Sequence, residues 1–466
     1  MKKAFLYLSV LGLALALAVS CSKDDGQETP EVTEIPDEGP EGSEIPYISI
    51  NTQGNTIVDE PKVASQMKIY SNQEEIFSTG IGIEYRGSTS QRLFDKKSYG
   101  LELWDETGDD YSEDLFEMGK EEDWILYGPY SDKTLLRNVL IYDLSNEIGQ
   151  YAVETEIVEL GINGNYAGVY IFMEKIKRDG DRLDIEKLDD DVTGGEEITG
   201  GYILKIDKTS GDTGNPDWEG DALYSEELGF RSKYGAYGNE LHYNAYGTKQ
   251  GEETYFLYEE PGYDDINSAQ KDYIQQYISD FEDALSAVDF SVSPRAYEAY
   301  IDVDSFVDFF ILNELSANPD AYRLSTFMYK DLGQKLKMGP IWDFNIAFGN
   351  DGRSAISGWI YQYNQSNPGD QWLVHFWWNK LLQDPQFRAK VKTRWQSLRS
   401  STLQSNYVTQ KIDDWAEYME TNGAIDRNYE KWDVIGETLP FNSFVGQSYQ
   451  EEVDYVKDWI NSRLSW

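Results

Sequence analysis

Two acidic residues, Asp320 and Asp343, flank a predicted β-hairpin, and their type and spacing suggest metal chemistry. The second lies in the run GPIWDFNIAFGN, at residues 339–350. A carboxylate before a hairpin and another after it suit a divalent cation that holds phosphates, because Mg²⁺ takes oxygen ligands, usually one or two carboxylates plus phosphate oxygens. The spacing makes a site for phosphoryl transfer the leading interpretation.

The hairpin is expected to bring these two residues to the same level. Residues 326–330 and 335–338 have the pattern of short strands, and the turn DLGQ at 331–334 separates them. Folding the chain back at that turn returns Asp343 to the level of Asp320. The residues alone leave a local role open, because either aspartate could serve a turn or a cap.

Basic side chains that could contact phosphates come from the first half of the chain. Arg86 precedes Gly87 and Ser88, which form a flexible loop with hydrogen-bond donors. Lys97 lies on the alternating face of a predicted strand, and Lys175 lies near the end of a predicted long hairpin. A surface charge or a structural ion pair is the competing interpretation of each.

The elements that must position these residues change character along the chain. Residues 47–207 read mostly as strands, with Asn163-Gly164 as a hairpin turn between runs 155–162 and 166–176. One helix, capped by Ser131 or Asp132 and ending near Ile148, interrupts them. Residues 208–263 read as inserted loops or a β excursion, and helical spacing dominates afterwards. The fold class expected is α+β, with a β-rich first half and a helical second half.

The N-terminus has the features of an export signal. Lys2 and Lys3 precede an apolar run, and small residues lead to Cys21, the chain's one cysteine. This resembles a bacterial lipoprotein signal, which implies a signal peptide at residues 1–20, lipidation of Cys21 and anchoring in the outer membrane at the cell surface. Residues 21–46 are acidic and Pro-rich, and we expect a disordered tether there.

Composition excludes several classes of function. A net charge of −44 argues against nucleic acid and against an anionic membrane surface, so that membrane contact is expected through the lipid anchor alone. With His242 and His375 as the chain's two histidines, a multi-histidine zinc site is disfavoured. Acidic pairs for glycoside hydrolysis are not excluded by composition, and the aromatic content leaves a carbohydrate-acting protein as a third alternative.

Several ordered segments resemble one known family, the CotH kinase family, over about 420 residues after the tether. The segments are YRGSTSQ, KKSYGLEL, DWILYGPYSDKTLLRN, NGNYAGVYIFMEKI, NEL…NPDAY, GPIWDFNIAFGN, DPQFRAKVKTRWQSLR and WINSRLSW. The resemblance implies an atypical protein-kinase-like fold of two lobes, ATP with Mg²⁺ (or Mn²⁺) as cofactors, and transfer of phosphate to Ser or Thr of exported or surface proteins.

The resemblance also implies roles for individual residues. Asp343 is similar in place to the metal ligand of a kinase DFG segment, and Asp320 would position the acceptor hydroxyl or share the metal. Asn345 stands where many relatives have an acid (WDxD); its carbonyl can still bind a metal, but one negative charge is lost. A surface binding or adhesion module that keeps the fold without catalysis is the second hypothesis, because ATP is scarce outside the cytoplasm and the chain has the features of an exported protein.

Overall fold

The computed structural model describes residues 38–209, 224–242, 246 and 251–466, which belong to one compact unit spanning residues 35–466. Cys21, the expected signal peptide and most of the expected tether lie outside the described residues. Residues 43–46 of that tether are ordered: Ser43 and Ile45 are buried, and the backbone N–H of Glu44 donates to Asn422 Oδ1 at 2.6 Å. Residues 43–46 therefore pack on the domain and do not belong to a disordered tether. Across the described part of the chain, the structure contains no helix with the length and hydropathy of a membrane span.

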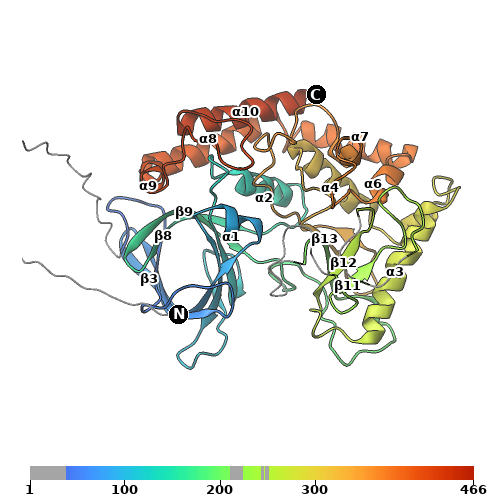
Figure 1. The fold of residues 1–466 in the computed structure, drawn as a ribbon, viewed down its shortest axis with the longest axis horizontal. Coiled ribbons are helices and arrows are strands. Elements are labelled where there is room, and N and C mark those ends of the chain that lie inside the picture. Colours follow the sequence, from blue (N-terminus) through green and yellow to red (C-terminus); the bar gives the residue numbers. More distant parts are fainter. Residues whose placement is uncertain (1–37, 210–223, 243–245, 247–250) are drawn as a thin grey trace, which may run out of the picture. The chain divides into compact units, whose positions relative to one another are not determined.

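The first half of the chain forms a closed β-barrel (Figure 1). Around the barrel the strand order is β1-β2-β3-β4-β7-β9-β8, and all neighbours are antiparallel except β1 and β8. Inward side chains at alternate positions, such as Ile81, Ile83 and Leu101, fill its core. The strands are β1 (Tyr47–Asn51), β2 (Val63–Ser71), β3 (Glu74–Arg86), β4 (Ser98–Trp104), β7 (Asp123–Tyr127), β8 (Thr155–Ile162) and β9 (Asn165–Glu174).

The predicted hairpin at Asn163-Gly164 is confirmed. Both residues have positive φ (52° and 73°), which a two-residue turn of the kind favoured by Asn-Gly requires, and they join β8 to β9. A small ribbon, β5 (Glu113–Asp114) with β6 (Lys120–Glu121), projects from the connection between β4 and β7.

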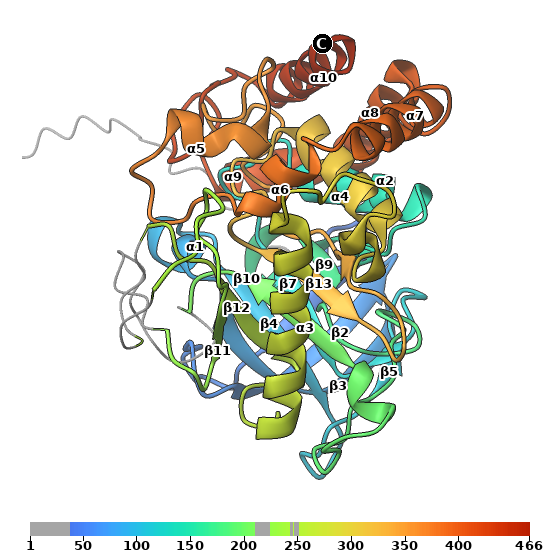
Figure 2. The ribbon, with the colours of Figure 1, turned by 90° about the vertical axis from the view of Figure 1, so that its right-hand side faces the viewer.

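A second sheet follows in the middle of the chain, with the order β11-β12-β10-β13-β14. Its strands are β10 (Tyr202–Ile206), β11 (Gly229–Arg231), β12 (Tyr255–Glu260), β13 (Thr326–Lys330) and β14 (Lys337–Met338). Helix α3 (Ser268–Ser286) covers it: Tyr273 stacks on Tyr202 of β10, and Lys330 Nζ of β13 lies 4.7 Å from the Tyr277 ring centroid (Figure 2).

Helices make up most of the remaining chain, which confirms the α+β class. Helix α2 begins at Arg137, five residues after the expected cap, because Asp132 accepts the backbone N–H groups of Thr134 and Arg137 in a turn where Leu135 has positive φ. The other helices are α1 (Thr89–Leu93), α4 (Val303–Ser316), α5 (Tyr363–Ser366), α6 (Phe376–Leu381), α7 (Pro385–Arg399), α8 (Ser405–Thr421), α9 (Ala424–Lys431) and α10 (Tyr449–Ser465); three short 3₁₀ turns are Glu197–Thr199, Ala296–Ala299 and Ile360–Gln362.

Candidate functional site

Three acidic segments meet at one end of the second sheet. Strands β10 and β13 are antiparallel with Ile206 opposite Thr326, so the residue after β10 and the loop before β13 share an end. Strand β14 is antiparallel to β13, with Met328 opposite Met338, so the chain leaves β14 at that same end. The register therefore places three carboxylates there: Asp207 after β10, Asp320 before β13 and Asp343 after β14.

Helix α2 fixes the backbone around Asp343. The backbone N–H of Asp343 donates to Tyr142 Oη (3.1 Å), and that of Phe344 donates to Asn138 Oδ1 (2.8 Å). Arg137 Nε donates to the carbonyl oxygen of Ala347 at 3.1 Å. Asp343 itself has φ +61°, a left-handed conformation that L-residues adopt at a cost and that is common at functional sites. The buried α2 thus holds a strained acidic residue in one place.

The pKa of the Asp343 carboxyl reflects its burial and its acidic neighbours. Burial raises the pKa of its carboxyl to about 7, and the negative charges of Asp320 and Asp207 contribute in the same direction. Lys208 and Arg86 oppose the rise. A carboxylate in an environment this negative is stabilised by an added cation, which is the behaviour expected of a metal ligand.

Asp320 has its own cationic partner. Arg323 Nη2 donates to Asp320 Oδ1 at 2.7 Å, and the Arg323 side chain is 2% exposed against 22% for Asp320. One carboxylate oxygen is therefore held by a buried guanidinium, whereas the Asp320 side chain as a whole still reaches solvent.

Of the three cations expected at phosphates, the structure brings Arg86 to the acidic residues. It ends β3, and its guanidinium carbon lies 5.9 Å from the ring centroid of Trp342, the residue before Asp343. Lys97 precedes β4, and its ammonium donates to the carbonyl oxygens of Gln91 and Phe94, so it stabilises the α1 turn.

Lys175 is likewise engaged elsewhere. Its Nζ lies 3.7 Å from Asp123 Oδ2, and its side chain is 40% exposed. The acidic neighbours Glu121 and Glu122 complete a group of three carboxylates, but Lys177 Nζ contacts all three at 2.6–3.2 Å. This group is a network of ion pairs.

Asn345 follows Asp343 by two residues and is partly buried. Its backbone carbonyl oxygen accepts a hydrogen bond from Asn350 Nδ2 at 2.8 Å, which closes the turn after the site. Its amide oxygen is neutral, so it would be a weaker ligand for a divalent cation than a carboxylate.

Sequence reasoning assigned no role to Lys208 or Arg323, and it left Asp207 open between a strand beside the nucleotide and a packing role. Asp207 and Lys208 follow a strand whose pairing with β13 is not encoded by local spacing. The sequence RLST contains no signal for a guanidinium that folds back onto the preceding acid. The one available hint was the placement of Asp207 directly after an apolar run, as expected for a strand end.

The donor set fits Mg²⁺ or Mn²⁺. Asp207, Asp320 and Asp343 offer carboxylate oxygens, and Asn345 offers an amide oxygen. Hard divalent cations prefer such oxygens, whereas zinc and copper sites draw on thiolates and imidazoles. Arg86 and Lys208 supply positive charge beside the acids, as an anionic phosphate chain requires.

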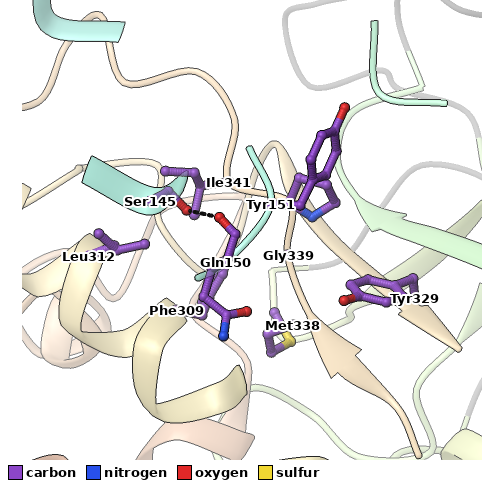
Figure 3. A pocket seen from close by; sticks show the side chains of 10 residues that line it. Ser145, Gln150, Tyr151, Phe309, Leu312, Tyr329, Met338, Gly339 and Ile341 are labelled. Carbon is purple, nitrogen blue, oxygen red and sulfur yellow. Dashed lines mark hydrogen bonds between the residues drawn. The ribbon is translucent and has the colours of Figure 1, made fainter. Parts of the chain in front are cut away.

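A small pocket is lined in part by residues 338–341, which belong to the segment that leads to Asp343 (Figure 3). Ser145, Gln150, Phe309, Met338 and Ile341 are among its lining residues, and Ser145 Oγ donates to the Gln150 carbonyl oxygen at 2.8 Å. The space open to the centre of a water-sized sphere is about 10 Å³, which is about the minimum for one water molecule. None of the candidate site residues lines it, and it does not accommodate a nucleotide.

Comparison with known proteins assigns most of the chain to one family. The family model described as CotH kinase protein matches residues 83–466, which include every site residue named above except the lipidation candidate. The inner spore coat protein H of Bacillus subtilis (strain 168) is similar to the chain, with 24% identity over 410 residues, which cover 88% of this chain and 91% of that protein. The chain belongs to the CotH kinase family.

Proposed function

We propose that this protein is an ATP- and Mg²⁺- (or Mn²⁺-) dependent protein-kinase-like phosphotransferase that acts on Ser or Thr of exported or surface proteins. The observation that carries the proposal is the convergence of Asp320 and Asp343 at one strand end, with Arg86 beside them. Family membership supports the same chemistry, because the matched model is that of a kinase.

The residues have distinct roles in this proposal. Asp343, with the amide oxygen of Asn345, holds the divalent cation, which when bound neutralises phosphate charge and orients the transferred group. Arg86 and Lys208 contact phosphate oxygens. Asp320 accepts the proton of the acceptor hydroxyl and aligns it, since phosphoryl transfer depends mainly on positioning and charge stabilisation.

The two sheets contribute different kinds of site residue, which fits a kinase-like arrangement in two lobes. The barrel supplies Arg86 from the end of β3, and the second sheet supplies the acidic residues. Helix α2, which lies between barrel strands β7 and β8 in sequence, carries the Tyr142 and Asn138 oxygens that accept hydrogen bonds from the backbone N–H groups of Asp343 and Phe344. We place the nucleotide between these two groups of residues.

The protein is proposed to work outside the cytoplasm. Lys2, Lys3 and the apolar run before Cys21 support export and lipidation, and the acidic tether supports display at the outer membrane surface. Replacement of Cys21 by Ser is expected to abolish lipid attachment, which metabolic labelling with a fatty acid measures. A labelled mutant would contradict the anchor.

Asn345 favours one alternative, a catalytically weak or inactive member of the family that serves as a surface binding or adhesion protein. Loss of one acidic charge beside Asp343 weakens a metal site. The alternative keeps the fold and the ordered acidic segments but predicts no phosphate transfer.

Radiolabelled ATP separates the two functions. The purified protein is incubated with [γ-³²P]ATP and Mg²⁺ or Mn²⁺, with itself and casein as acceptors, beside Asp343→Asn and the exposed control Asp184→Asn. A kinase labels protein in the wild type and in Asp184→Asn, and loses labelling in Asp343→Asn. If the wild type neither transfers phosphate nor gains thermal stability with nucleotide and metal, the binding module is the correct function.

A further inference from the structure

Arg323 connects Asp320 to a segment more than forty residues away. Its Nε donates to the Pro319 carbonyl oxygen (2.8 Å), its Nη2 to Asp320 Oδ1 (2.7 Å) and its Nη1 to the Trp372 carbonyl oxygen (3.1 Å). The side chain is 2% exposed. All three nitrogens of one buried guanidinium are thus engaged, and one of them holds the proposed acceptor-aligning carboxylate.

The guanidinium is held in orientation by its own surroundings. Its carbon lies 4.2 Å from the ring centroid of Tyr363. Tyr363 Oη donates to Asp370 Oδ2 at 2.6 Å, and Asp370 Oδ1 accepts from the Trp372 backbone N–H (2.9 Å) and from Arg323 Nη1 (3.5 Å). Tyr363, Asp370 and Trp372 therefore form a cage that fixes both the plane and the direction of Arg323.

The same cage reaches the second acidic segment. Trp372 Nε1 donates to Tyr224 Oη (3.2 Å), and Tyr224 Oη donates to the Asp207 carbonyl oxygen (2.7 Å). Lys208 Nζ lies 5.3 Å from the Trp372 ring centroid. One segment, residues 363–372, consequently sets the positions of the elements that bear Asp320 and Asp207.

Arginine is suited to this task for physical reasons. Asp320 lies between α4 and β13, outside any regular helix or strand, in a loop where Tyr322 and Ser325 have positive φ. A planar guanidinium presents five N–H donors in a rigid geometry and stacks on aromatic rings, whereas lysine is a flexible point charge. A lysine at position 323 would keep the charge near Asp320 but lose the orientation.

We propose that Arg323, clamped by Tyr363, Asp370 and Trp372, is a positioning residue that acts through Asp320 to align the acceptor hydroxyl for phosphate transfer. The proposal rests on the proposed function. It assigns Arg323 no contact with nucleotide, so its replacement changes turnover and leaves nucleotide binding intact.

The test compares Arg323→Lys with a matched variant elsewhere in the chain. Arg295 makes a similar arrangement: its Nη2 donates to Asp384 Oδ1 at 3.0 Å, its Nε contacts the same carboxylate, and Tyr297 Oη donates to Asp384 Oδ2 at 2.7 Å. Initial rates of [γ-³²P]ATP transfer to casein give kcat and KM for ATP in the wild type, Arg323→Lys and Arg295→Lys. Thermal unfolding is measured on each.

The proposal is supported if Arg323→Lys lowers kcat by about 100-fold, because a misplacement of about 1 Å costs a factor of this size. In that case KM for ATP stays within threefold of the wild-type value, and Arg295→Lys remains active. Equal kcat in the two lysine variants overturns it. A further readout is Arg323→Ala with millimolar methylguanidinium, which restores turnover if the missing group acts by position.

If the Arg323 variants unfold, Tyr363→Phe tests the positioning role of Arg323. It removes the hydroxyl bond to Asp370 and keeps the ring under the guanidinium, so kcat is expected to fall about tenfold with unchanged KM for ATP. Unchanged kcat overturns the proposal. A wild type that transfers no phosphate refutes the proposed function and this inference together, whereas an active wild type with an active Arg323→Lys refutes the inference alone.

Discussion

The backbone N–H of Asp343 donates a 3.1 Å hydrogen bond to the hydroxyl oxygen of Tyr142, a fully buried residue of helix α2. The proposed metal ligand is therefore fixed by a helix that lies two hundred residues earlier in the chain. Because Asp343 has positive φ, this contact helps to maintain a conformation that the residue would otherwise leave.

Replacement of Tyr142 by Phe is expected to leave the Asp343 N–H without its acceptor. The loss of one buried hydrogen bond lowers the free energy of unfolding by about 1 kcal/mol. Phosphate transfer should fall by a larger factor than stability explains, since the carboxylate is no longer held. Tyr297→Phe, which also removes a buried hydroxyl bond, is the control; an equal loss of activity in both variants would show that Tyr142 acts through stability alone.

Substitutions of the three basic residues expected at phosphates should have different effects on nucleotide binding and on stability. Arg86→Met is expected to reduce the thermal stabilisation that ATP and Mn²⁺ provide, because Arg86 faces Trp342 and opposes the charge on Asp343. Lys175→Met should leave that stabilisation unchanged, since Lys175 pairs with Asp123. Lys97→Met should lower stability with and without nucleotide, because it removes the bonds to the Gln91 and Phe94 carbonyls.

Differential scanning fluorimetry with and without ATP and Mn²⁺ measures all three variants. A nucleotide effect that survives in Arg86→Met and disappears in Lys175→Met would reverse the assignment and place the phosphates near the Lys175 carboxylate network instead.

Asp207→Asn tests whether the third carboxylate belongs to the metal site. In chelator, the variant should unfold at a higher temperature than the wild type, because removal of one negative charge relieves repulsion at Asp343. Its Mn²⁺ affinity, measured by the electron paramagnetic resonance signal of free Mn²⁺, should fall by roughly 10-fold or more. Asp184→Asn, an exposed acid, should change neither quantity.

The opposite result would separate Asp207 from the metal. Its Oδ2 accepts a 3.5 Å hydrogen bond from Ser325 Oγ, so a purely structural role predicts a loss of stability in Asp207→Asn that Ser325→Ala reproduces.

Stability should also depend on pH through two buried glutamates outside the site. Burial raises the pKa of Glu174 and of Glu314 to about 7 from an ordinary value of 4.5. Between these values the folded chain binds more protons than the unfolded chain, so the free energy of unfolding falls as pH rises from about 4.5 to about 7 and is then constant for these groups. Each contributes at most roughly 3 kcal/mol.

Chemical denaturation from pH 5 to pH 8 measures this dependence. Glu314→Gln should flatten the profile, and Glu106→Gln, an exposed control, should reproduce that of the wild type. A wild-type stability that rises with pH across this range would contradict the assignment, because carboxyls with raised pKa lower stability there and carboxyls with lowered pKa contribute a nearly constant amount above about pH 5.

The parts of the site that could be predicted from the sequence are those set by residues close together in the chain. The turn at residues 331–334 joins strands β13 and β14, so simple chain reversal was sufficient to bring Asp343 back to Asp320. Lys97 was expected on a strand face from a spacing of two, whereas it precedes β4 and its ammonium donates to the nearby carbonyl oxygens of Gln91 and Phe94, which a spacing of two does not reveal. Asp207 depends on pairing between β10 and β13, which are more than a hundred residues apart.

Closure of the barrel could not be predicted from the sequence, because it also depends on pairing between strands that are far apart in the chain. Alternation identified the strands, but the parallel pairing of β1 with β8 joins segments separated by about a hundred residues. The pattern of neither strand specifies its partner, because alternating apolar residues indicate which face of a strand is buried but not which strand lies beside it.

Asn345→Asp places an acidic side chain two residues after Asp343, and its effect on the protein is expected to differ without and with metal. Without metal, a further negative charge beside Asp343 increases repulsion, so the melting temperature should fall below that of the wild type. With Mn²⁺, the added carboxylate should strengthen binding on the order of 10-fold, because ligand charge sets affinity at oxygen sites. Asn72→Asp, on the exposed β2–β3 turn, supplies the control for added charge.

Isothermal titration with Mn²⁺ and melting in chelator test both halves of this expectation. Tighter binding together with faster phosphate transfer would show that Asn345 weakens a working kinase, which agrees with the proposed function. Tighter binding with no transfer in either protein would favour the surface binding module, because the metal site would then be competent without catalysis. Unchanged affinity in Asn345→Asp would remove position 345 from the metal ligands and leave Asp343 with the other carboxylates at the strand end as the donors.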